Sequence, residues 1–177
     1  MENYRADNIV MNNVKTAISV DMYYGSKDML KVPISVETPF FKNIHFSNIT
    51  AVNVEEAVEF IGLPEAPIEG ISVTNSNFTA IKGFEVSFVK ALVLTDVIVN
   101  CREENPLNIS RTNDIVINNF GTTNALKSKA VIQLKNTSDV FIHDCKVKEG
   151  TEIFLNSSDT KDLKFENNWL RNAKVLQ

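Results

Sequence analysis

One short pattern recurs along this chain: an apolar residue, any residue, a second apolar residue, any residue, and then Asn or Asp. The seven copies are Ile9-Met11-Asn13, Ile44-Phe46-Asn48, Ile71-Val73-Asn75, Leu92-Leu94-Asp96, Ile115-Ile117-Asn119, Val140-Ile142-Asp144 and Leu163-Phe165-Asn167. Their first residues are 35, 27, 21, 23, 25 and 23 positions apart. A fixed core with spacers of variable length is typical of a solenoid, in which each coil keeps its strand and varies its loops.

A second strand-like run follows each of the first six copies. The runs are AISVDMYY (17–24), AVEFIGL (57–63), FEVSFV (84–89), PLNIS (106–110), AVIQL (130–134) and EIFL (152–155). They are rich in Val, Ile and Phe, which favour strands, and only VNVEEAVEF (52–60) could also form a helical turn. Leucine-rich repeats have similar periods, but they need a Leu lattice and a helical segment that this chain lacks.

Short strands without helices must find partners outside their own coil. Stacked coils of about 23 residues would pair each strand with its copy in the next coil. We therefore predict an all-β fold, a parallel β-helix of about seven coils that forms a single domain over residues 1–177. The handedness rule for parallel crossovers favours the right-handed form.

The Asn or Asp that ends each copy falls on the same side of its strand as the two apolar residues. Stacking would place these residues in one row, roughly 4.8 Å apart. We predict a structural ladder at an interior turn corner, in which the amides bond one another and Asn48 is buried. The predicted ladder consists of Asn13, Asn48, Asn75, Asp96, Asn119, Asp144 and Asn167.

Charge and composition narrow the classes of partner. The 177 residues carry a net charge of −4, which does not suit a phosphate-binding surface, so nucleic acid is not an expected partner. No apolar run is long enough to span a bilayer, so a membrane is not expected either. The polar start MENYRADNIV is not a signal peptide, and a mature chain, a truncated chain or a cytoplasmic protein would all begin in this way.

The residues that most often bind metals or react are scattered along the chain. His45 and His143 fall in outward rows several coils apart, so we expect two solvated side chains rather than one site. Cys145 follows a ladder position in an apolar row, so it should be a small core residue. Cys101 lies in a different register, which argues against a disulfide. We predict no cofactor and no metal.

Known catalytic signatures are absent: the chain has no phosphate loop, no G-x-G-x-x-G, no G-x-S-x-G and no H-E-x-x-H. An inverting glycosidase needs two carboxyl groups about 6.5–9.5 Å apart, and on a β-helix these would come from adjacent coils. The strand ends compared for such a pair are 21–24, 60–62, 88–90, 110–111, 134–136 and 155–157. Only the first offers an acid, Asp21, so we predict no acid pair in register.

Two stretches carry a resemblance to a known family. NIVMNNVKTAISVDMYYG (8–25), followed by PFFKNIHFSNITAV (39–52), resembles glycoside hydrolase family 28, the polygalacturonase family of pectin-degrading enzymes. Members of that family show a strand, an Asn turn, a "pI-x-I-D-x-x-Y" run, a loop and then "I-x-[FY]-x-N-I". The resemblance covers most of the chain and corresponds to the C-terminal coils of the family's β-helix.

The resemblance implies a right-handed parallel β-helix that hydrolyses α-1,4 bonds between galacturonic acids, with inversion and without metal. The family's Asn-Thr-Asp, Asp-Asp, Gly-His-Gly and Arg-Ile-Lys motifs do not occur here, and in the family they precede the matched region. The chain therefore resembles the C-terminal part of a longer β-helix, with no catalytic residue and no activity expected alone. Tyr24 matches a Tyr that lines the sugar subsites, Tyr23 is the adjacent alternative, and Asp21 matches an acid without a firm role.

The resemblance also makes a polygalacturonate-type polysaccharide the expected partner and implies an extracellular or periplasmic location. A first coil with nothing before it would expose its interior row and its strand edge, so we expect self-association through the N-terminal coil. Two other classes stay open. One is a noncatalytic β-helical module for carbohydrate binding or surface structure; the other is a polysaccharide lyase, which would need Ca²⁺-binding acids beside an Arg or Lys base.

Overall fold

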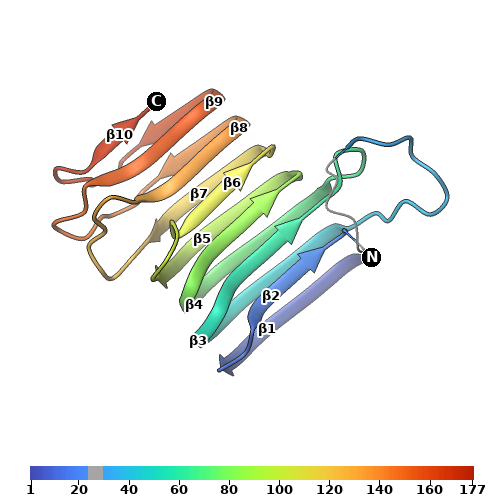
Figure 1. Ribbon diagram of the computed structural model, residues 1–177, viewed down its shortest axis with the longest axis horizontal. Helices are drawn as coiled ribbons and strands as arrows, with labels where there is room; N and C mark the ends of the chain where they lie inside the picture. The colour runs from blue at the N-terminus through green and yellow to red at the C-terminus, as the bar shows by residue number, and fades with distance from the viewer. Residues whose placement is uncertain (24–29) are drawn as a thin grey trace.

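The computed structural model describes residues 1–23 and 30–177, and every regular element in this part of the chain is a β-strand (Figure 1). The strands are β1 (Glu2–Asn12), β2 (Thr16–Asp21), β3 (Lys42–Ile61), β4 (Ile68–Ser87), β5 (Val89–Cys101), β6 (Leu107–Ser110), β7 (Asn113–Gly121), β8 (Ala130–His143), β9 (Ile153–Glu166) and β10 (Lys174–Leu176). Nothing in the described part of the chain is a helix that could cross a membrane.

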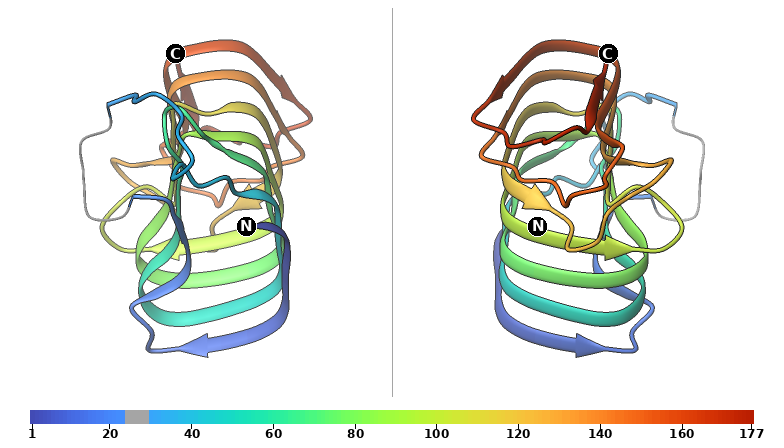
Figure 2. Two further views of the ribbon diagram at one scale, coloured as in Figure 1. Left: turned by 90° about the vertical axis from the view of Figure 1, so that its right-hand side faces the viewer. Right: turned by 90° about the vertical axis from the view of Figure 1, so that its left-hand side faces the viewer.

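All neighbouring strands are parallel, which confirms the predicted β-helix. The order is β1-β3-β4-β5-β7-β8-β9-β10, with β2 beside β3 and with β6 paired to β4 and β8. Figure 2 shows the chain winding into stacked coils. The solenoid makes about five turns, so the predicted count of about seven coils is too high. The prediction counted each of the seven sequence copies as one coil.

Two apolar columns form the core of the solenoid, one behind each of two sheet faces. The first face carries the repeated pattern that ends in Asn or Asp, and the second face carries the strand-like run that follows it in each coil. The column of the first face consists of Ile44, Ile71, Leu92, Ile115 and Val140. The column of the second face consists of Val58, Phe84, Leu107, Ile132 and Leu155. All ten side chains are almost fully buried, and burying each one contributes roughly 1.5–3 kcal/mol. Since β3 and β4 bend and run through both faces, these columns fix the outward positions of both faces as well.

The seven predicted ladder residues do lie at turn corners, but the corners are exposed rather than interior. Each residue has a φ between 46° and 57°, a left-handed conformation that Asn and Asp tolerate better than other non-glycine residues. A left-handed residue shifts the alternation of side chains by one position, so the next residue points inward, as the buried Ile49 does after Asn48. The prediction of a buried Asn48 is wrong because backbone conformation, not burial, selects Asn there.

The predicted first member of the ladder is also wrong. The register of β1 against β3 puts Asn8, not Asn13, on the rung of Asn48. Asn13 lies at the following corner beside Asn53, and both are left-handed, with φ of 56° and 55°. The copy of the repeat that belongs to the row is YRADN (4–8). Its Tyr4 and Ala6 take the places of Ile44 and Phe46 in the next coil.

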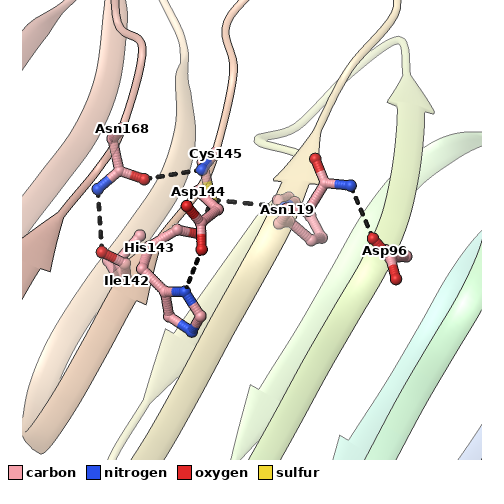
Figure 3. Close-up of polar contacts among 8 residues, drawn as sticks. Asp96, Asn119, Ile142, His143, Asp144, Cys145 and Asn168 are labelled. Carbon is pink, nitrogen blue, oxygen red and sulfur yellow. Dashed lines mark hydrogen bonds and ion pairs between the residues drawn. The ribbon is translucent and has the colours of Figure 1, made fainter.

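Hydrogen bonds join some ladder residues to the rung before them. Asn119 Nδ2 donates to Asp96 Oδ1 at 2.7 Å (Figure 3). The amide of Asn75 donates to Asn48 Oδ1, and Asn48 Nδ2 donates in turn to Asp7 Oδ1 at 2.7 Å. The ladder is therefore a set of short hydrogen-bonded chains on the surface.

The corner after β8 is closed by a different side chain. Asn168 Oδ1 accepts a hydrogen bond from the backbone N–H of Cys145 at 2.9 Å, and Asn168 Nδ2 donates to the backbone oxygen of Ile142 at 2.9 Å (Figure 3). Cys145 has no exposed surface, which confirms its predicted place in the core. Both Cys101 and Cys145 are free thiols.

Candidate functional site

The residues implied by the resemblance lie at the end of β2. Tyr24 is outside the described residues. Asp21 is exposed, and its Oδ1 accepts a hydrogen bond from the backbone N–H of Tyr23 at 2.7 Å. The hydroxyl of Tyr23 is buried and has no hydrogen-bond partner within residues 1–23 and 30–177. Burial and the charge of Glu65 raise the pKa of Tyr23, and the positive charge of Arg111 opposes that shift. Tyr23 therefore lies within the electrostatic reach of Arg111.

The second face of the solenoid carries an outward row of polar side chains, which we call the polar row. Its members are Ser19, Glu59, Glu85, Asn108, Gln133 and Asn156. Neighbours along the row are one strand spacing apart, roughly 4.8 Å. The Ser19 hydroxyl donates to Glu59 Oε2 at 3.3 Å, and Asn156 Nδ2 donates to Gln133 Oε1 at 2.9 Å. A regular polar track of this kind suits an extended ligand with repeating polar groups.

The N-terminal half of the polar row is acidic. Glu59 and Glu85 lie opposite each other on adjacent strands. Together with Glu56, Lys82 and Glu104 they line a hollow of about 210 Å³. Lys82 Nζ bonds Glu56 Oε1 at 3.1 Å, so the cation of the hollow is held by an acid outside the polar row. Glu59 and Glu85 face each other as like charges.

This pair contradicts the prediction that no acids meet in register. The strand ends were compared with Phe60 aligned to Phe88, whereas the structure pairs Phe60 with Val86. Phe88 is already a left-handed corner residue, with φ of 51°. Because the true register is two residues earlier, the acids just before Phe60 and Val86, which are Glu59 and Glu85, come together.

Glu85 has the most perturbed carboxyl group of the polar row. Partial burial between neighbouring rungs, together with the negative charges of Glu104 and Glu59, raises its pKa to about 7. The side chain still reaches solvent, and screening by water moderates the shift. A carboxyl group that keeps its proton near neutral pH can donate a hydrogen bond or act as a general acid.

The C-terminal half of the polar row is neutral, and cations lie beside it. It is formed by the amides Asn108, Gln133 and Asn156. Arg111 directly follows β6 and Lys135 lies within β8; both are exposed, and the backbone N–H of Arg111 donates to the backbone oxygen of Lys135 at 3.0 Å. The Arg111 guanidinium lies over the ring of Phe88, 5.5 Å from its centroid. This half thus combines amide groups with two positive charges.

Within the described residues, no group of three or more His, Cys, Asp or Glu side chains could hold a metal ion. His45 on β3 bonds Ser72 Oγ through Nδ1 at 2.7 Å. His143 on β8 contacts its neighbour Asp144 at 2.7 Å and stacks on Phe141. The two histidines are on strands that do not neighbour each other, as predicted, and each has its own local partners.

Comparison with known proteins adds no assignment: no family model, no curated protein and no solved structure matches this chain. The resemblance to the polygalacturonase family therefore rests on the stretches 8–25 and 39–52 alone. Function has to be argued from the second face.

Sequence reasoning missed four residues of this face: Glu59, Glu85, Arg111 and Lys135. A usable signal was present in the corners that follow the second-face strands. Arg111, Asn136 and Asp159 occupy one left-handed row there, with φ of 47°, 52° and 50°. If β6, β8 and β9 had been aligned so that Arg111, Asn136 and Asp159 share one row, the alignment would have placed Lys135 next to Arg111. It would also have given the register of the polar row.

Proposed function

We propose that this chain is a β-helical module that binds an acidic polysaccharide of the polygalacturonate type along the C-terminal half of the polar row. The observation that carries the proposal is the run of amides on β6, β8 and β9 with Arg111 and Lys135 beside it. Amides match sugar hydroxyls as donors and acceptors, and cations pair with uronate carboxylates. The three rungs extend roughly 10 Å along the solenoid.

The acidic half of the row limits where such a ligand can lie. Glu59 and Glu104 carry negative charge beside Glu85, and like charges repel a polyanion at neutral pH. The ligand is therefore confined to the half that lies toward the C-terminal end of the solenoid.

The resemblance to the polygalacturonase family supports a more specific version of this proposal. In that version the chain is the C-terminal part of the β-helix of a polygalacturonase-type glycoside hydrolase that acts on pectin, and its coils contribute binding and not catalysis. The same binding face would serve a noncatalytic carbohydrate-binding module that belongs to no hydrolase. Both versions make the same prediction for the isolated chain: it binds the polymer and does not cleave it.

The test compares binding of oligogalacturonate with binding of the same oligomer after its carboxyl groups have been reduced. Wild-type protein should bind only the charged oligomer, and more weakly as salt rises. The double substitution Arg111→Ala with Lys135→Ala should weaken binding about two- to thirtyfold, since each exposed charge pair contributes about 0.2–1 kcal/mol. Lys164→Ala, which removes an exposed cation from β9 on the first face, is the matched control. Unchanged binding in the double variant would refute the proposed site.

A second candidate function is glycoside hydrolysis by the chain itself. Glu59 and Glu85 favour it, because glycosidases use two neighbouring carboxyl groups of which one keeps its proton near neutral pH. Release of reducing ends from polygalacturonate at pH 5, lost in both Glu59→Gln and Glu85→Gln, would establish this activity. If the protein binds the oligomer but releases no reducing ends, hydrolysis is excluded and the binding function is supported.

A further inference from the structure

The N-terminal end of the solenoid is an open apolar surface. Tyr4 and Ile9 are 46% and 37% exposed, and they border a hollow of about 410 Å³ that Met11, Ile18 and Val20 also line. β1 and β2 each have a strand on one side only, as Figure 1 shows for the end of the stack. An unpaired strand edge above exposed apolar side chains is a surface suited to association.

Charge decides which surface can cover this end. One outward row of the first face begins at Arg5 and ends at Lys164, and a second begins at Asp7 and ends at Glu166. If the C-terminal end of a second copy continued the stack, Lys164 would lie beside Arg5 and Glu166 beside Asp7. Like charges in directly neighbouring positions are destabilising, so head-to-tail stacking is disfavoured.

Two N-terminal ends are complementary instead. A two-fold axis through the middle of β1, near Ala6, runs the two β1 strands antiparallel and sets Arg5 opposite Asp7 of the second copy, twice by symmetry. Asp7 is fixed on its rung, since Ser47 Oγ donates to its Oδ1 at 2.6 Å, Asn48 Nδ2 donates to the same oxygen at 2.7 Å, and Asn8 Nδ2 donates to its Oδ2 at 2.6 Å. Such an arrangement is isologous and closed, like most homodimers, and it covers both open apolar ends.

We propose that two copies of this 177-residue chain pair through their N-terminal coils, with the β1 strands antiparallel and Arg5 of each copy opposite Asp7 of the other; in a longer β-helix, preceding coils would occupy the same edge of β1 instead. This contact is independent of the proposed polysaccharide site, because β6, β8 and β9 lie toward the other end of the solenoid (Figure 1). Ligand binding and association can therefore be tested separately.

Sedimentation velocity of the full 177-residue chain tests the proposal. Protein concentrations of about 1 to 100 µM cover the dissociation constants of weak dimers. A dimer of twice 19.8 kDa is expected. Arg5→Asp should raise its dissociation constant about tenfold or more, because it turns two attractive pairs into repulsive ones. Ile9→Lys should act in the same direction by placing a charge on the apolar end.

Lys164→Asp is the matched control, since it changes the sign of the equivalent outward position on the last rung of the same row. It should leave the dimer unchanged, whereas in a head-to-tail stack it would strengthen association. Circular dichroism and urea midpoints verify that each variant is folded. A monomer at the highest concentration, assemblies that grow beyond the dimer, or indifference to both Arg5→Asp and Ile9→Lys would overturn the proposal.

Discussion

Replacing Asn75 by Ala and by Gly separates two contributions that Asn makes at a solenoid corner. Asn75 has a φ of 46°, and its side-chain amide donates to Asn48 Oδ1 on the preceding rung. Ala removes the hydrogen bond and also the residue type that tolerates this φ. Gly removes the hydrogen bond but adopts the left-handed conformation freely.

The expected losses follow from these two terms. A residue such as Ala costs about 1–2 kcal/mol in the left-handed region, and loss of the hydrogen bond costs about 0.5–1.5 kcal/mol. Asn75→Ala should therefore lower the free energy of unfolding by roughly 2 kcal/mol. Asn75→Gly should lower it by roughly 1 kcal/mol, from the lost hydrogen bond and the more flexible unfolded chain.

Urea unfolding followed by far-UV circular dichroism measures both losses. Asn77→Ala is the matched control, because Asn77 is an exposed residue of the same strand whose φ is not left-handed. It should change the free energy of unfolding by less than about 0.5 kcal/mol. Equal losses for Asn75→Ala and Asn75→Gly, or an Asn75→Ala loss no larger than that of the control, would show that backbone conformation is not what selects Asn at these corners.

Three further outcomes are expected. Gly83→Ala should destabilise the fold by about 1–3 kcal/mol or more, since a Cβ there would lie 2.4 and 2.5 Å from two backbone oxygens; Gly121→Ala, with one backbone oxygen at 3.1 Å, should cost less in the same urea titration. The pKa of Glu85 is raised from its ordinary 4.5 to about 7, so the folded state binds the proton more tightly and stability falls as pH rises across that window. Glu85→Gln should remove that fall between pH 5 and pH 8, and an unchanged pH dependence would contradict the assignment. Cys145 is fully buried with a pKa raised to about 11, so a chromogenic thiol reagent should label it only as the protein unfolds; labelling in native buffer at the unfolded rate would count against its core position.

The fold could be predicted because its signal is local. Alternation of period two, ended by Asn or Asp and repeated at solenoid spacing, is visible within each coil and survives changes of loop length. The register could not be read in the same way. Some left-handed corners are occupied by residues that give no turn signal, including Phe88, Ala91 and Arg111 with φ of 51°, 61° and 47°. Each such corner shifts the alternation by one position, and the shift is set by the backbone rather than by side-chain type.

The candidate site was harder to predict than the fold for a related reason. Which side chains face one another across coils depends on the register, so an error of two residues at Phe88 hid the meeting of Glu59 and Glu85. Glu104 reaches the same hollow from the loop between β5 and β6, and no periodic pattern places a loop residue. Only the positions of the cations Arg111 and Lys135 could have been predicted, from the left-handed row that contains Asn136 and Asp159.

The acidic hollow also bears on the lyase class, which the sequence left open. Its acids are not grouped to hold an ion within the described residues, so the state of its basic residue decides. A lyase needs a basic residue that gives up its proton near the working pH, which requires a lowered pKa. The hydrogen bond and the negative charge of Glu56 instead raise the pKa of Lys82, the cation of this hollow. Lys82 therefore stays charged and paired, and the hollow offers the protonated acid that a hydrolase would use rather than the free base that a lyase would require.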